Sequence, residues 1–240
     1  MTLYKTLKQL VFIITGILFA GLSFAQQPDT DNRNKPIKEY QVFNEFLGGD
    51  SVRLCKGHPC TGKIKDYYQN GELKHKGYYN KGKLTTTYTN YFMNGQKERI
   101  FNKKNVNKAE LKVFYRNGEE RSLITYWKGE PLEWKEFTKN GTLEFYELYD
   151  KSLEYVEIRT YYFKDGTKSS HMEIKDKRKG VYTKKLFYED GTLKAKGEVL
   201  HNRYINAYRH NNEWIYYDEQ GNPELKQEYV KGKVVREEEL

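Results

Sequence analysis

The stretch Tyr67-Tyr68-Gln69-Asn70-Gly71-Glu72-Leu73 runs two aromatic residues into an Asn-Gly turn, and this pattern recurs seven times along the 240-residue chain, the last time in a looser form. The turn glycines are Gly71, Gly95, Gly118, Gly141, Gly166, Gly191 and Gly221, and successive numbers differ by 24, 23, 23, 25, 25 and 30. A nearly constant period in this range marks a repeat architecture, in which each unit packs mainly against its neighbours. The glycines are therefore predicted to have a structural role.

A second, weaker turn lies about half a period after most Asn-Gly turns. Its clearest forms are Asn80-Lys81-Gly82-Lys83, Trp127-Lys128-Gly129-Glu130 and Val230-Lys231-Gly232-Lys233. Asn-Gly and Asp-Gly supply the positive φ angles that a two-residue hairpin turn needs. Each unit is therefore predicted to be strand, Asn-Gly turn, strand, Lys-Gly turn, and seven such units imply on the order of 14 strands.

The segments between the turns alternate in polarity. One of them has its apolar residues on one side and its charged residues on the other: Leu193, Ala195, Gly197 and Val199 against Lys194, Lys196 and Glu198. A period of two is typical of a half-buried antiparallel strand, and recurring aromatic residues can stack across such strands. We therefore expect an all-β fold with very little helix: an extended antiparallel meander of repeated β-hairpins.

The first 25 residues have the composition of a secretory signal peptide. Lys5 and Lys8 precede an apolar run, and Ser23-Phe24-Ala25 supplies the small residues of a cleavage site before Gln26. The alternative is an uncleaved membrane anchor, for which the run is marginal. We expect residues 1–25 to be a signal peptide, 26–39 a flexible leader, 40–233 the repeat domain and 234–240 a charged tail. The mature chain is then exported and is periplasmic, extracellular or associated with the outer membrane.

Cys55 and Cys60 are the only two cysteines, and they flank Lys56-Gly57-His58-Pro59. In an oxidising compartment, so close a pair most simply forms one disulfide across a tight turn. The alternative is a metal site, which needs two or more further ligands, with His58 as the only local candidate. The sequence therefore predicts a local Cys55–Cys60 staple.

Composition and motifs argue against several functional classes. The net charge of +9 falls to +7 without the signal, which holds two Lys and no acid, and the acids are interleaved with lysines. Basic runs such as Lys175-Asp176-Lys177-Arg178-Lys179 favour solvated turns over a nucleic-acid site. The five histidines are scattered, and no nucleophile elbow or phosphate-binding loop is present. We expect no enzyme activity, no metal, no cofactor and no nucleic-acid partner.

The unit Tyr-Tyr-x-Asn-Gly-x-Leu, followed half a period later by Tyr-x-x-Gly-Lys, resembles the MORN-repeat-variant family, whose bacterial members are commonly labelled YwqK-type antitoxins. The closest matches are residues 67–73 with 79–83, and residues 187–193. Residues 57–62 resemble the opening turn of the family, with Cys60 where an aromatic residue is usual. The resemblance covers about residues 51–233. Half-turns near residues 102–105 and 201–202 lack the glycine, and the last unit carries an insertion.

The resemblance implies a protein-interaction or membrane-association module without catalytic residues. We therefore expect an exported repeat scaffold for protein–protein interaction at the cell envelope. The alternative is glycan or anionic-lipid binding through an aromatic and basic sheet face, for which the candidate rings are Tyr126, Trp127, Trp134 and Trp214. Structural stacking inside the sheet is the other interpretation of the same rings.

Overall fold

The computed structural model describes residues 52–240, which all belong to one compact unit, Ile37–Leu240. The predicted signal peptide and leader, and the predicted start of the repeats at residue 40, lie outside the described residues. The strands are β1 Leu54–Cys55, β2 His58–Pro59, β3 Gly62–Tyr67, β4 Leu73–Asn80, β5 Lys83–Tyr91, β6 Lys97–Lys103, β7 Lys108–Phe114, β8 Glu120–Trp127, β9 Glu130–Phe137, β10 Leu143–Tyr149, β11 Val156–Tyr162, β12 Lys168–Asp176, β13 Val181–Phe187, β14 Leu193–Asn202, β15 Ala207–Tyr217, β16 Pro223–Val230 and β17 Lys233–Glu239.

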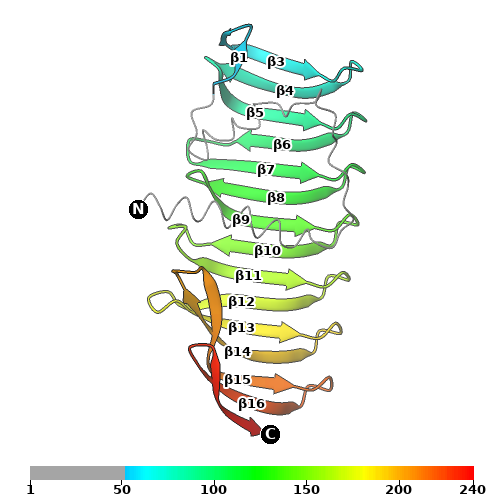
Figure 1. Ribbon diagram of the computed structural model, residues 1–240. Coiled ribbons are helices and arrows are strands. Elements are labelled where there is room, and N and C mark those ends of the chain that lie inside the picture. Colours follow the sequence, from blue (N-terminus) through cyan, green and yellow to red (C-terminus); the bar gives the residue numbers. More distant parts are fainter. Residues whose placement is uncertain (1–51) are drawn as a thin grey trace. The chain divides into compact units, whose positions relative to one another are not determined.

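Strands β3 to β17 form one open antiparallel sheet of fifteen strands in sequence order, and β1 and β2 form a separate two-stranded ribbon (Figure 1). This confirms the predicted all-β meander of hairpins. No helix occurs among residues 52–240. The charged C-terminal residues differ from the expected tail. They form the edge strand β17, in which Glu237 pairs with Gln227 and Val234 with Tyr229.

The Asn-Gly turns differ from the predicted two-residue geometry. At the first one, the Gly71 amide donates to the Tyr68 carbonyl (3.0 Å), and the Tyr68 amide donates to the Glu72 carbonyl (2.8 Å). Gly71 is left-handed, with φ +86°, whereas Asn70 is not. The Asn70 side-chain oxygen instead accepts a hydrogen bond from the Glu72 amide (3.1 Å). This is a three-residue loop, a type I turn followed by a left-handed glycine.

The Lys-Gly half-turns are the two-residue turns. Lys81 and Gly82 both have positive φ, at +49° and +78°. The same holds for the pairs Lys128 and Gly129, and Lys231 and Gly232. Two left-handed residues in succession form the type I′ turn that suits the twist of a hairpin. Asn-Gly is compatible with both turn types, so the dipeptide alone did not distinguish them.

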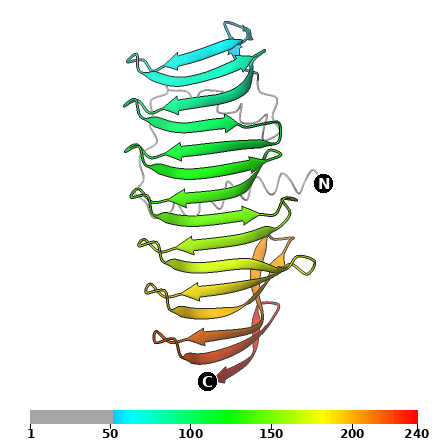
Figure 2. The same cartoon turned by 180° about the vertical axis from the view of Figure 1, so that it is seen from behind.

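Strand alternation gives the sheet two faces, each crossed by a row of directly paired residues. The capped face carries the row Ile64, Gly77, Tyr88, Phe101, Leu111, Ile124, Trp134, Glu147, Arg159, Met172, Lys184, Gly197, Trp214, Gln227 and Glu237. The open face carries the row Lys65, Lys76, Thr89, Ile100, Lys112, Leu123, Lys135, Tyr146, Thr160, His171, Lys185, Lys196, Ile215, Lys226 and Glu238. Figure 1 looks onto the capped face and Figure 2 onto the open one.

The ribbon β1–β2 caps the first strands of the sheet. Cys55 and Cys60 are bonded, with 5.1 Å between their Cα atoms, as predicted. The Arg53 amide donates to the Gly82 carbonyl (2.8 Å), and the Gly82 amide donates to the Cys60 carbonyl (2.7 Å). Cys60 is buried in a cluster with Tyr79 and other residues of the capped face. The disulfide therefore closes the ribbon, and the buried Cys60 with the hydrogen bonds to Gly82 attaches the ribbon to the sheet.

The insertion in the last unit lengthens β14 and β15 and bends them out of the sheet. The register shifts between Gly197 and Glu198, and Asn212 adopts a left-handed φ of +56°. The indole nitrogen of Trp214 donates to the Glu198 carbonyl (2.8 Å) at this bend. Beyond it, residues 198–212 form a hairpin arm that crosses the capped face (Figure 1).

The arm adds a second layer over β11 to β13. The ring of Tyr208 packs edge-on against Tyr182 of β13, with 5.1 Å between the centroids, and the guanidinium of Arg159 lies over it at 5.4 Å. The His201 amide donates to the Gly180 carbonyl (2.9 Å). Tyr182 is fully buried as a result. The buried residues here form a second cluster: Val156, Met172, Tyr182, Ala195, Val199 and Trp214.

Candidate binding surface

An ion pair with a buried carboxylate lies on the capped face beneath the arm. Glu147 of β10 and Arg159 of β11 face each other across the strands and form an ion pair, and the Glu147 side chain is 5% exposed. Burial lowers the pKa of the Lys184 amine, and the nearby Arg159 lowers it further. The arm covers this pair, Glu147 neutralises Arg159, and Arg159 contacts Tyr208 of the arm. We therefore infer that the pair helps to hold the arm in place.

The four aromatic residues predicted to bind a ligand do not form one exposed stripe. Trp214 and Tyr126 are 0% and 6% exposed and belong to different buried clusters. The indole of Trp134 donates to the Glu136 carboxylate (2.5 Å) on the capped face. Trp127 lies at the end of β8, with the Lys128 amine 5.9 Å above its ring. Packing inside the sheet, in line with the other interpretation, accounts for the burial of Trp214 and Tyr126.

One histidine, His75, also has a structural role. His75 is buried, with Nδ1 2.6 Å from the Asn90 side-chain oxygen and Nε2 2.9 Å from the Tyr79 hydroxyl. Burial lowers the pKa of its imidazole. Within residues 52–240, no three His, Cys, Asp or Glu side chains gather as metal ligands would, and no helix is long and apolar enough to span a bilayer.

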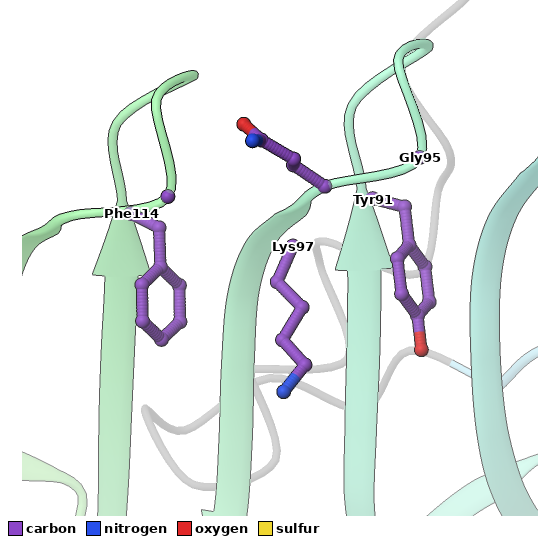
Figure 3. A pocket seen from close by; sticks show the side chains of 6 residues that line it. Tyr91, Gly95, Lys97 and Phe114 are labelled. Carbon is purple, nitrogen blue, oxygen red and sulfur yellow. The ribbon is translucent and has the colours of Figure 1, made fainter.

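Accessible aromatic rings lie instead on the open face, just before each Asn-Gly turn. They occur on alternate strands: Tyr67, Tyr91, Phe114, Phe137, Tyr162, Phe187 and Tyr217. Between two of them is a shallow hollow of about 360 Å³, with Lys97 between the rings of Tyr91 and Phe114 (Figure 3). At ~4.8 Å per strand, neighbouring rings of this row are about 9.6 Å apart.

Lysines flank this ring row, and their amines lie over rings. The Lys76 amine is 5.4 Å from the centroid of Tyr91, and the Lys196 amine is 5.5 Å from that of Tyr217. Such cation–π contacts fix the long lysine stems against the sheet. Most other lysines of the open-face row have acid partners: Lys112 with Glu120 (3.2 Å), Lys135 with Glu133 (3.0 Å) and Lys226 with Glu213 (2.6 Å).

The open-face residues were not singled out from the sequence, although a signal for them exists. Lys63, Lys65 and Tyr67 alternate with Gly62 and other residues of the opposite face along one predicted strand. If residues are paired one by one on the two sides of an Asn-Gly turn, Lys63, Lys65 and Tyr67 fall beside the lysines of the following strand. The bulge at each three-residue turn shifts that count by one, so the true turn geometry was needed first.

Comparisons with known proteins leave the family open. No known family profile matches the chain, and no curated protein matches it. Among solved structures, a mutant of S. aureus TarM in complex with fondaparinux, alpha-GlcNAc-glycerol and UDP aligns with 9% identity and a TM-score of 0.30. That alignment covers 56% of this chain and 22% of the other, so the chain spans about a fifth of that protein. A similarity at this level supports no conclusion about fold or function.

Proposed function

We propose that this protein is an exported, non-catalytic repeat scaffold of the MORN-variant type, which binds a partner protein at the cell envelope through its open face. The observation that carries the proposal is the unbroken paired row from Lys65 to Glu238 across all fifteen strands. Such a face extends about 67 Å across the strands at ~4.8 Å per strand. It is large enough for the ~800 Å² that each partner buries in a standard interface.

The chemistry of the open face supports a binding role. It combines half-buried aromatic rings with ion pairs such as Lys135 with Glu133, a mixture that suits a specific and wet protein interface. The label of antitoxin would require a cytoplasmic partner, which conflicts with the expected export. The proposal is therefore limited to a scaffold.

Site-directed photo-crosslinking in envelope fractions tests the proposal. A photoreactive residue at Ile100 or Leu123, in the N-terminal half of the open-face row, is expected to yield a discrete crosslinked protein. The matched control is Val106, which is exposed in the β6–β7 loop. Crosslinking at none of these sites, or equally at all three, would count against a partner on the open face.

A further inference from the structure

We propose that the open face also carries two subsites for an anionic linear glycan, one centred on Lys65 and Lys76 and the other on Lys185 and Lys196. This inference does not rest on the protein partner proposed above. Lys65 of β3 lies directly opposite Lys76 of β4, and Lys185 of β13 lies directly opposite Lys196 of β14. Like charges placed directly opposite each other destabilise a sheet. A bound anion removes that repulsion.

Two acids that are close to these lysines in sequence are engaged elsewhere. Asp66, next to Lys65, points to the capped face and binds the Arg53 guanidinium (2.5 Å). Glu198, two residues after Lys196 on the same strand, binds the Lys175 amine. Its carboxylate also accepts a hydrogen bond from the side-chain amide of Asn212 (2.6 Å). Among the described residues, no ion pair neutralises the four central lysines.

The two subsites have the same construction, although they are more than a hundred residues apart. Both contain Leu-Lys-x-Lys-Gly, at residues 73–77 and 193–197. The Lys74 amine lies 5.3 Å from the ring centroid of Tyr68, and the Lys194 amine lies 5.1 Å from that of Tyr188. With the contacts of Lys76 and Lys196 described above, two ring-supported amines meet the ligand at each subsite. Opposed Cβ atoms are about 5 Å apart. The amines of Lys76 and Lys196 lie over Tyr91 of β5 and Tyr217 of β15, on the side away from Lys65 and Lys185, which leaves room for an oxyanion between the two amines of each pair.

The neighbouring rings favour a sugar polymer over other polyanions. Tyr67 and Tyr78, beside the first subsite, are 55% and 54% exposed, and exposed aromatic faces suit the flat apolar side of a pyranose. The ring row repeats about every 9.6 Å across the strands, close to the length of one disaccharide in an extended chain. A glycan that crosses the strands would therefore meet a ring at each repeat.

The charge pattern disfavours a flat anionic membrane as the ligand. Beside the open-face row, the same face carries a second row of paired residues. This second row contains Glu110, Glu133, Glu173 and Glu198. A broad negative surface would meet these acids together with the lysines. A narrow chain that runs along the ring row and touches the lysine pairs avoids them.

Calorimetric titration of the purified protein with a long oligogalacturonate, at low and at physiological ionic strength (about 0.15 M), tests the inference. We expect binding that weakens with salt, a roughly tenfold loss of affinity for Lys65→Gln with Lys76→Gln, and a similar loss for Lys185→Gln with Lys196→Gln. The matched control is Lys112→Gln with Lys135→Gln, which removes two acid-paired lysines of the same row and should change affinity less than twofold. Tyr67→Ala should also weaken binding.

Folding of the variants provides a second measurement. Because Lys65→Gln relieves repulsion from Lys76, its melting temperature should equal or exceed that of the parent protein. Absence of binding, an equal loss in the control variant, or a melting temperature lowered by Lys65→Gln would overturn the inference. Equally tight binding of polyglutamate or of anionic phospholipid vesicles, with the same sensitivity to Lys65→Gln and Lys76→Gln, would also overturn it, since sugar chemistry would then be irrelevant.

Discussion

The two ends of the sheet are built from the same unit, but they are capped in different ways. Gly77 and Gly197 occupy equivalent places, and each lies opposite an aromatic residue, Tyr88 or Trp214, of the next strand. At the N-terminal end, the disulfide-bonded ribbon covers the capped face. At the C-terminal end, the arm covers it without a disulfide, through ring packing on Tyr182, the hydrogen bond from the His201 amide to Gly180 and the contact of Tyr208 with Arg159. A repeat unit that cannot bury its own face can thus be closed by a covalent staple or by a longer hairpin.

The largest difference is expected between the ion pairs at the two ends. Arg159→Met leaves Glu147, whose side chain is 5% exposed, without its partner beneath the arm, and should cost about 3–5 kcal/mol. Arg53→Met leaves Asp66, whose side chain is 31% exposed, and should cost about 2 kcal/mol or less, because water can replace the lost contact.

Hydrogen exchange at Tyr182 and at Tyr79 measures the two effects separately, which matters because a repeat sheet can open from one end. Adding Glu147→Gln to Arg159→Met should recover part of the loss, since no charge is then left unpaired. Equal costs at the two ends would show that the arm does not exclude water from the pair.

The next difference concerns the two equivalent glycines. A Cβ at position 197 would lie 2.4 Å from ring atoms of Trp214, which is fully buried. Gly197→Ala should therefore cost about 3 kcal/mol or more, in the upper range for overpacking. At position 77 the nearest atom is 2.9 Å away, on the Tyr79 ring. Gly77→Ala should cost about 1–2 kcal/mol. Denaturant unfolding of both variants makes the comparison, and a reversed order would contradict the packing argument.

Loss of the disulfide should affect only the N-terminal end. The loop-closure model gives about 2 kcal/mol for so short a loop. Cys55→Ser with Cys60→Ser is expected to raise hydrogen exchange around Tyr79 and Leu84, while the amides around Trp214 keep their protection. A thiol titration of the native parent protein should find no free thiol. A drop in protection at both ends would mean that the sheet unfolds as one cooperative unit.

The smallest effect is expected from pH. Burial lowers the pKa of His75 at the N-terminal end, and burial also lowers that of His210 at the C-terminal end. As the pH falls through about 6.5, the unfolded chain takes up these protons before the folded one, so stability falls by at most about 1.4 kcal/mol per pH unit and group. Unfolding between about pH 7.5 and 5.5 should show this loss, reduced in His75→Gln. A flat profile would indicate that His75 is not desolvated.

Much of the fold could be predicted from local chemistry, and the turns show where that prediction stopped. The spacing of Gly71 to Gly221 predicted the hairpin repeats and the order of the strands, because strand alternation and left-handed glycines depend on neighbouring residues. Which of the two turns had two residues depended on the register of the flanking strands. That register is set by pairing along the whole strand.

The candidate binding surface was harder to predict than the fold. The rings of Tyr126 and Trp214 suggested a ligand site because they are large and aromatic, but packing from distant strands buries both. The 30-residue step before Gly221 marked an insertion without indicating that it would fold back over β11 to β13.

The sequence alone determined the repeat, the β-strands with their two faces and the Cys55–Cys60 staple, because each depends on residues close together in the chain. Only the tertiary structure decided which face is covered, how the arm closes over Glu147 and Arg159, and that Lys65 and Lys76 lie opposed while Asp66 is engaged by Arg53. Those outcomes depend on register and on contacts between distant segments, which no local pattern encodes.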